Sequence, residues 1–186
     1  MKKLILLIIL ITFSNISKGV IINNDSIVNI AKEVYKKWSK YSDKKLVIIV
    51  DFSRPMEQDR LFIVDIDKSE IILSSKVCHG IGSGETSVPT KFSNIEESKM
   101  SSKGVMITKE TYLGYFGYSM KIEGLQSTNS NVRKRSIIFH SSLKLSTPWS
   151  WGCFSTPEEN NKKIINMTKN GTLIFSFSNK NDIKNI

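Results

Sequence analysis

The chain has 186 residues, of which 40% are hydrophobic, and its 27 Lys and Arg residues against 17 Asp and Glu residues give a formal net charge of +10. This length is enough for one domain with a hydrophobic core of its own. The positive charge favours an anionic partner, but the lysines are scattered along the chain, without a basic run interleaved with aromatic residues. We therefore expect no nucleic acid partner.

Residues 1–19 have the pattern of a secretory signal peptide. Lys2 and Lys3 precede the almost unbroken apolar run Leu4–Phe13, and the small residues Ser17 and Gly19 fit a signal-peptidase site. The run is about ten residues long, whereas a membrane-spanning helix needs about 20. The pattern predicts cleavage after Gly19, export to the periplasm, the cell envelope or the extracellular space, and no stable membrane anchor.

Residues 20–45 are predicted to form an N-terminal helical segment, followed by one continuous domain over residues 46–186. From Asp25 to about Tyr41, apolar residues recur at helical spacing beneath a lysine-rich face. They are Ile27, Ile30, Ala31, Val34, Trp38 and Tyr41.

Alternating apolar stretches then predict strands. These stretches are residues 45–53, 60–67, 69–78, 104–112, 118–124, 135–140 and 171–178. A second helix is predicted to begin after Thr156, which would be its N-cap, with Pro157 in the first helical position, Glu159 completing a capping box and Gly171 ending it. The expected fold class is mainly β with two or more helices (α+β), built on a curved β-sandwich or barrel-like sheet.

The two cysteines, Cys78 and Cys153, are too few for the disulfide framework of a small exported protein. Cys153 could be an inert core thiol, half of a disulfide, a metal ligand or a nucleophile. A nucleophile needs a base and donors for an oxyanion. His140 ends a predicted strand thirteen residues before Cys153, and Gly152 permits a sharp turn whose amides point at a bound carbonyl. The predicted downstream helix should lower the thiol pKa.

From spacing alone, a catalytic pair and an inert cysteine beside a core histidine both remain open. The stretches "RSIIFHSS" and "SWGCFSTPEENNKKIINMTKNGTLIFSFS" resemble the catalytic domain of the murein L,D-transpeptidases, in which a histidine, a short loop and Ser-x-Gly-Cys follow one another. With "CHGIGSGETSVPTKFSN" upstream, the resemblance runs from about Val77 to Ser178. The chain departs from the family pattern at Ser141, Trp151 and Phe154, which stand where Gly, His, and Pro or an aliphatic residue are usual.

The resemblance implies a curved β-sheet catalytic fold and a peptidoglycan stem peptide as the partner. The Cys153 thiolate would attack the L,D bond of a tetrapeptide, release D-alanine and pass the acyl group to an amine, or to water in an L,D-carboxypeptidase. His140 would be the base, Ser150 would orient its imidazole, and the Gly152 and Cys153 amides would form the oxyanion hole. No metal and no cofactor is implied, and a monomer is expected.

Further residues near the motif have two interpretations each. Arg135 could hold a substrate carboxylate or pair with Glu123. Trp149 and Trp151 could wall the substrate groove or serve packing, and His79 could border the site or make structural hydrogen bonds. Three tyrosines are expected mainly to pack, with one hydroxyl as a conceivable oxyanion donor. They are Tyr112, Tyr115 and Tyr118.

Other classes of protein fit the sequence less well. Cys78, His79, His140 and Cys153 could in principle bind zinc, but an adjacent Cys-His pair is poor geometry for one tetrahedral ion. Sortases need an arginine after the cysteine, and the last arginine here is Arg135. Papain-like peptidases place Cys before His. The remaining alternative is an inactive wall-binding relative. Cys78 is expected to be a buried strand residue that forms no bridge with Cys153.

Overall fold

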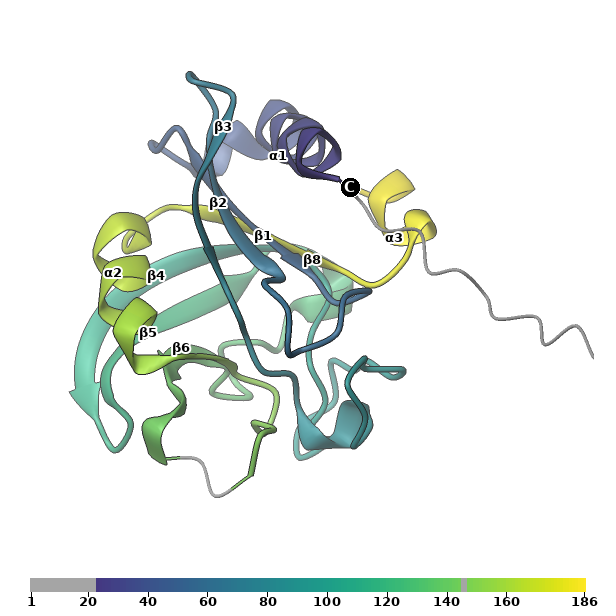
Figure 1. Cartoon of the computed structure of the whole chain (residues 1–186), viewed down its shortest axis with the longest axis vertical. Helices are drawn as coiled ribbons and strands as arrows, with labels where there is room; N and C mark the ends of the chain where they lie inside the picture. The colour runs from purple at the N-terminus through teal and green to yellow at the C-terminus, as the bar shows by residue number, and fades with distance from the viewer. Residues whose placement is uncertain (1–22, 145–146) are drawn as a thin grey trace, which may run out of the picture.

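The computed structural model describes residues 23–144 and 147–186, so the predicted signal peptide lies outside the described residues. They form a mixed eight-stranded sheet with three α-helices (Figure 1). The strands are β1 (Leu46–Asp51), β2 (Leu61–Asp65), β3 (Glu70–Ser75), β4 (Gly104–Gly114), β5 (Gly117–Gly124), β6 (Ile138–Ser141), β7 (Phe154–Thr156) and β8 (Leu173–Phe177). The helices are α1 (Asn24–Trp38), α2 (Glu158–Thr168) and α3 (Lys180–Lys184).

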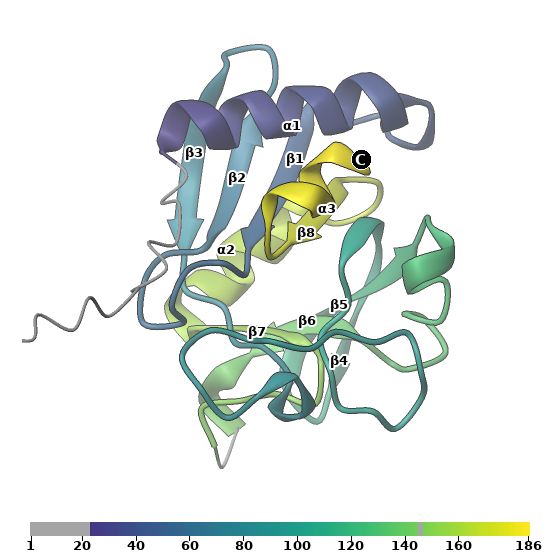
Figure 2. The same ribbon diagram turned by 90° about the vertical axis from the view of Figure 1, so that its right-hand side faces the viewer.

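The strand order is β3-β2-β1-β8-β4-β5-β6-β7. The pairs β1–β8 and β6–β7 are parallel, and the other five neighbouring pairs are antiparallel. The sheet is strongly curved, but β3 and β7 remain its two edges, so it does not close into a barrel (Figure 2). The predicted α+β class is confirmed.

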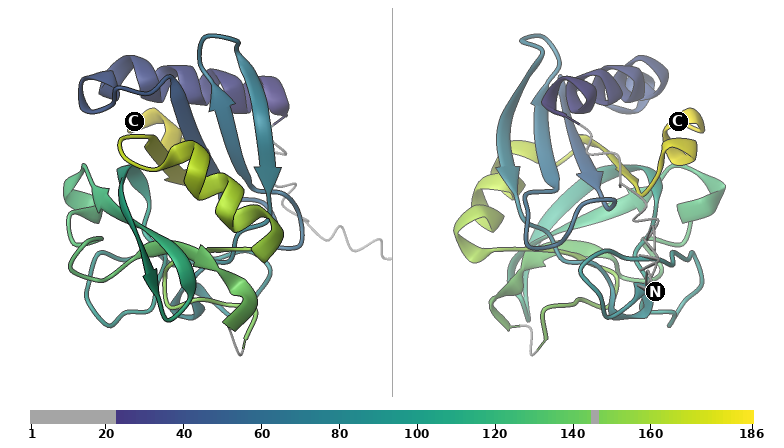
Figure 3. Two further views of the ribbon diagram at one scale, coloured as in Figure 1. Left: turned by 90° about the vertical axis from the view of Figure 1, so that its left-hand side faces the viewer. Right: turned by 45° about the vertical axis from the view of Figure 1, so that its right-hand side comes forward.

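The curvature gives the sheet two buried faces. Along β1, Ile48 and Val50 belong to the core that α2 covers, whereas Val47 and Ile49 belong to the core beneath α1. Figure 3 shows α1 and α2 on opposite sides of β1–β3. Burial of both faces explains why this strand is a continuous apolar run and does not alternate with polar residues.

Helix α1 confirms the helical periodicity. The Asn23 side chain caps it by accepting a hydrogen bond from the Ser26 amide at 2.9 Å. The helix ends at Trp38 and continues as a 3₁₀ turn over Ser39–Tyr41, so the predicted span is right to within one residue at its start. Within the described residues, no helix is long and apolar enough to cross a membrane.

The predicted start of α2 is wrong. Thr156 is the last residue of β7, where it pairs with Ser141 of β6, and Pro157 is the N-cap without a side-chain hydrogen bond. Sheet pairing therefore holds Thr156 extended, and its hydroxyl contacts Asn161 at 3.3 Å. Strand β7 and helix α3 were not predicted, because segments of three and five residues are too short to show a period.

Candidate active site

The edge pair β6–β7 positions the two candidate catalytic residues. His140 lies in β6 beside Ser155 of β7, and Cys153 directly precedes β7. Both His140 and Cys153 line one cavity of about 610 Å³. Its other walls come from the β4–β5 hairpin, from β6 and from the segments before β6 and β7. The residues are Tyr112, Tyr115, Phe116, Arg135, Ser136, Ile138, Thr147, Trp149 and Trp151.

The His140 imidazole is held in one tautomer. Its Nδ1 lies 2.8 Å from the backbone oxygen of Ser141, and a carbonyl oxygen only accepts, so Nδ1 carries the proton and Nε2 has a free lone pair. The ring is 1% exposed and stacks on Phe116 with 4.1 Å between centroids. Burial lowers the His140 pKa, and the bond to Ser141 only partly opposes it. The imidazole is thus neutral at pH 7.

The Cys153 thiol is half-buried and donates to the backbone oxygen of Ser136 at 3.7 Å. Burial raises its pKa, while the Ile138 amide and the Arg135 charge act in the opposite direction. The prediction that the downstream helix lowers this pKa is wrong, because β7 separates Cys153 from α2 and burial dominates. No hydrogen bond between thiol and imidazole occurs in the described part of the chain, so the resting pair is neutral.

Ser150 fixes the turn that carries the cysteine. Its hydroxyl donates to the Cys153 oxygen at 2.8 Å and accepts from the Gly152 amide at 3.1 Å. The predicted contact between Ser150 and the imidazole is not found in residues 23–144 and 147–186, where the acceptor for the ring is the Ser141 oxygen. Because the Gly152 amide already donates to the Ser150 hydroxyl, the Cys153 amide is the one predicted oxyanion donor of the two that is left to bind a substrate oxygen.

Arg135 braces the segment that faces the cysteine turn. It was predicted to begin a strand, but the observed strand β6 starts three residues later, at Ile138. Its guanidinium donates to the backbone oxygens of Ser93 and Met100, both at 2.6 Å, and to the hydroxyls of Ser102 at 2.7 Å and Ser98 at 3.2 Å. Through these four hydrogen bonds Arg135 stabilises the loop over residues 93–102, whether or not it also binds a substrate.

The suggested ion pair between Arg135 and Glu123 is wrong, since Glu123 pairs with Lys109 at 3.0 Å. Burial lowers the Arg135 pKa, and the charge of Cys153 raises it. Arg135 also lines the cavity that His140 and Cys153 share. The alternative that it holds a substrate carboxylate therefore stays a prediction.

The two tryptophans both wall the cavity. Trp151 is 72% exposed, and the Lys99 ammonium lies 4.7 Å from its ring centroid. A large exposed aromatic ring beside a cavity is available for contact with a ligand. Trp149 is only partly exposed.

His79 does not border the cavity. It is fully buried, its Nδ1 lies 2.9 Å from Arg60 Nη2, and its Nε2 lies 3.0 Å from the Gly84 oxygen. Both ring nitrogens are therefore engaged, with Nδ1 accepting and Nε2 donating. Of the two roles considered for His79, the structure therefore supports structural hydrogen bonding and not a place in the cavity wall.

The hairpin aromatics divide between the cavity and the surface. Tyr112 lines the cavity, and its pKa is raised by burial and by the nearby Cys153 charge. Tyr118 donates to Asn166 at 3.1 Å, while Tyr115 is 75% exposed and contacts Phe116 edge-on. Phe116 was not predicted as a site residue, although an aromatic pair between Gly114 and Gly117 is an available signal for a hairpin tip over the site.

The four candidate zinc ligands lie in different surroundings. His79 is enclosed by Arg60 and Gly84, whereas Cys78 lines a different cavity from His140 and Cys153. Among the described residues, no group of three or more His, Cys, Asp or Glu side chains could hold a metal ion.

Both cysteines are free thiols in the structure. Cys78 follows β3 and is only partly buried, so its predicted place within a strand is wrong.

The neutral resting pair has a measurable consequence. In a Cys78→Ala variant, where Cys153 is the remaining thiol, the rate of alkylation by iodoacetamide should rise about tenfold per pH unit from pH 6 to 9, because the thiol pKa lies above its ordinary value of about 9. A thiolate–imidazolium pair would instead give a plateau below pH 8. Such a plateau, read by mass spectrometry, would show that the resting state is the ion pair.

Comparison with known proteins identifies the family. The family model for an L,D-transpeptidase catalytic domain matches residues 21–177. The chain belongs to this family, which confirms the resemblance seen in its motifs. No curated protein matches the chain.

Two solved structures share the fold at TM-scores above 0.5. The helical cell shape determining protein Pgp2 (K307A mutant) of Campylobacter jejuni aligns with a TM-score of 0.53 and 10% identity, over 82% of this chain and 56% of that one. A fused Zn-dependent amidase/peptidase/peptidoglycan-binding domain-containing protein of Clostridium acetobutylicum gives 0.51 and 16%, over 83% and 59%. An L,D-transpeptidase of Stackebrandtia nassauensis gives 0.46 and 15%, over 84% and 68%. This chain spans little more than half the length of the first two.

Proposed function

We propose that this chain is an exported peptidoglycan L,D-transpeptidase that uses Cys153 as nucleophile and His140 as base. The observation that carries the proposal is that both side chains line one cavity, with the His140 Nδ1 proton directed to the Ser141 oxygen. This arrangement leaves Nε2 as the only ring nitrogen that can take a proton. The family match begins at residue 21, just after the predicted cleavage site, which supports export.

In the proposed reaction, neutral His140 takes the thiol proton as the sulfur attacks the carbonyl on the L-centre side of the L,D bond. The Cys153 amide donates to the developing oxyanion. The C–N bond then breaks, the imidazolium returns its proton to the departing D-alanine, and a thioester remains. An incoming amine attacks the thioester, His140 takes the amine proton, and the thiol is restored.

The cavity suits a peptide that carries carboxylates. Its volume of about 610 Å³ lies within the range of sites that bind ligands of several tens of atoms. Tyr112, Trp149 and Trp151 offer flat apolar walls, while Arg135 in the wall and Lys99 over Trp151 supply positive charge. Cleavage after Gly19 would remove Lys2, Lys3 and Lys18 and no acidic residue, which takes the net charge from +10 to 10 − 3 = +7. This positive charge of the mature form favours the approach of an anionic polymer.

The test is incubation of the purified mature protein with disaccharide-tetrapeptide muropeptides, with products read by mass spectrometry. A transpeptidase gives cross-linked dimers with loss of one D-alanine per dimer formed. Tripeptides without dimers would identify an L,D-carboxypeptidase, in which water is the acceptor. Unchanged tetrapeptides, with the protein folded and its thiol reduced, would favour an inactive wall-binding relative and end the proposal.

A further inference from the structure

The turn between β4 and β5 consists of two aromatic residues. Gly114, the last residue of β4, lies opposite Gly117, the first residue of β5, so Tyr115 and Phe116 form the turn. Hairpin turns of this length usually carry small or polar residues such as Gly, Asn and Asp. The left-handed backbone that the turn needs is supplied by Gly117, at φ = +77°. The geometry of the turn therefore gives no reason for an aromatic pair at this place.

The two turn residues differ in what they contact. Tyr115 is 75% exposed, whereas Phe116 is partly buried and stacks on the His140 imidazole, with 4.1 Å between the ring centroids and 27° between the ring planes. The backbone pairing of β5 with β6 ends at Met120 and Phe139, one residue before His140. Beyond that point the hairpin leaves β6, and the Phe116 ring makes the contact with His140 that the backbone does not make.

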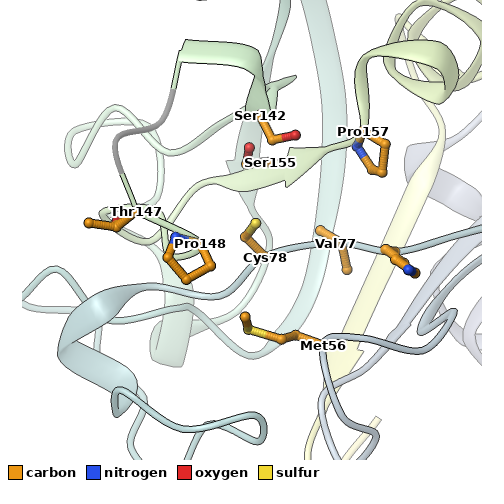
Figure 4. Close-up of a pocket in the computed structure, with 9 residues that line it drawn as sticks. Met56, Val77, Cys78, Ser142, Thr147, Pro148, Ser155 and Pro157 are labelled. Atoms are coloured by element: carbon orange, nitrogen blue, oxygen red, sulfur yellow. The ribbon is translucent and has the colours of Figure 1, made fainter.

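The other contacts of His140 leave its ring a degree of freedom that the stack removes. In the sheet His140 lies beside Ser155 of β7, which lines the separate cavity of Cys78 (Figure 4). Its Nδ1 lies 2.8 Å from the Ser141 oxygen. A single hydrogen bond still allows the imidazole to tilt about the N–H···O direction, and a ring packed face to face on it restricts this tilt. Neither contact uses Nε2, the nitrogen that would take the thiol proton.

We propose that Phe116 is a positioning residue for the candidate base. Its ring holds the His140 imidazole in the one orientation in which Nδ1 keeps its bond to Ser141 and Nε2 stays available to the Cys153 thiol, and it keeps water off the ring face. This inference rests on the proposed function of His140 as the base. The stack itself is measurable without any turnover, so the two proposals can fail separately.

The loss of the Phe116 ring has a defined effect on proton binding. Burial is the main cause that lowers the His140 pKa below its ordinary value of 6.5, and Phe116 covers one face of the imidazole. In Phe116→Ala, water reaches this face and solvates the imidazolium, so the His140 pKa should rise toward 6.5. The face of a phenyl ring also attracts a cation, but the direction of the shift shows that burial outweighs this attraction.

The charged groups around His140 are the same in the unsubstituted protein and in the Phe116 variants. They are Cys153, Tyr112 and Arg135 in the shared cavity, and Lys121 of β5 and Glu158 and Glu159 of α2, on the two elements that also pack against β6. The His140 pKa responds to burial and to the Ser141 oxygen rather than to these charges. A difference in the His140 titration between variants therefore reports the cover of the ring.

NMR of the imidazole nitrogens tests the inference directly. The chain has two histidines, and the structure gives them opposite tautomers, with the proton on Nδ1 of His140 and on Nε2 of His79. Long-range ¹H–¹⁵N spectra of the reduced, ¹⁵N-labelled mature protein therefore distinguish the two rings. In Phe116→Ala we expect the His140 titration to move to higher pH and its Nδ1 proton to exchange with water at least about tenfold faster. The fully buried His79 should not change, which shows that the fold is kept.

Two further variants separate the stack from the hairpin. Phe116→Tyr keeps the ring and should restore the titration and the proton exchange of the unsubstituted protein. The matched control is Leu113→Ala, which removes an 83% exposed side chain from the same hairpin without touching the cavity wall, and should change neither. An unchanged His140 titration and proton exchange in Phe116→Ala, or the same changes in Leu113→Ala, overturns the inference.

Muropeptide turnover by the same variants links the stack to the reaction. In Phe116→Ala, kcat should fall about tenfold to a hundredfold, by more than KM rises, and the acid limb of kcat/KM should move to higher pH together with the His140 titration. Unchanged kcat in Phe116→Ala, with the His140 titration moved, would show that the stack does not position the base. Absence of turnover in the unsubstituted protein would contradict the proposed function instead, while the NMR comparison still decides whether Phe116 holds the imidazole.

Discussion

Replacing Cys153 with Ala is expected to lower turnover of tetrapeptide muropeptides by at least about 10⁴-fold, since removal of a nucleophile eliminates the covalent route and leaves only binding and oxyanion stabilisation. Cys153 is partly buried, and its sulfur makes two weak contacts, with the Ser136 oxygen at 3.7 Å and with the Ile138 amide. The substitution therefore removes little packing. We expect the melting temperature to change by only a few degrees while dimer and tripeptide products disappear from the mass spectrum.

The matched variant is Cys153→Ser, which keeps nearly the same volume and a hydrogen-bond donor. A serine hydroxyl is a far weaker nucleophile than a thiol without a stronger base, so this variant should be nearly as inactive as Cys153→Ala. Dimers formed at a rate within tenfold of the unsubstituted protein by either variant would exclude the thiol mechanism.

The parts of the fold that follow from local pattern could be predicted from the sequence. The apolar spacing from Ile27 to Val34 specifies one face of α1, and that face is buried. The continuous apolar run of β1 predicts a strand because it is short and rich in β-branched residues. The order His140, loop, Gly152, Cys153 predicts that a strand end and a turn meet, and both residues line one cavity.

What could not be predicted depends on contacts between distant segments. Arg60 lies nineteen residues before His79, and nothing local shows that the guanidinium is fully buried against that imidazole. The same holds for Arg135, whose four bonds go to a loop 33 to 42 residues away. The thiol pKa of Cys153 was predicted in the wrong direction, because burial by the surrounding strands outweighs the helix that follows in sequence.

Replacing Gly152 with Ala is expected to destabilise the protein and to inactivate the site. The backbone at Gly152 has φ = +109°, and an added Cβ would lie 2.6 Å from the Met100 oxygen and 2.9 Å from the Ile137 side chain. Backbone strain of about 1–3 kcal/mol and an overpacking cost of about 1–3 kcal/mol would act together. The free energy of unfolding should therefore fall by about 2–6 kcal/mol, and the Cys153 turn should shift.

Gly171→Ala is the matched control, because Gly171 has a nearly equal φ of +104° with no atom within 4 Å of the added Cβ. It should show the backbone strain alone, so urea unfolding should place Gly152→Ala about 2 kcal/mol below Gly171→Ala. Muropeptide turnover should be lost only in Gly152→Ala, since Gly152 alone of the two borders the cysteine and donates its amide to Ser150. Equal unfolding free energies in the two variants would show that the close packing of Gly152 against Met100 does not hold this turn in place.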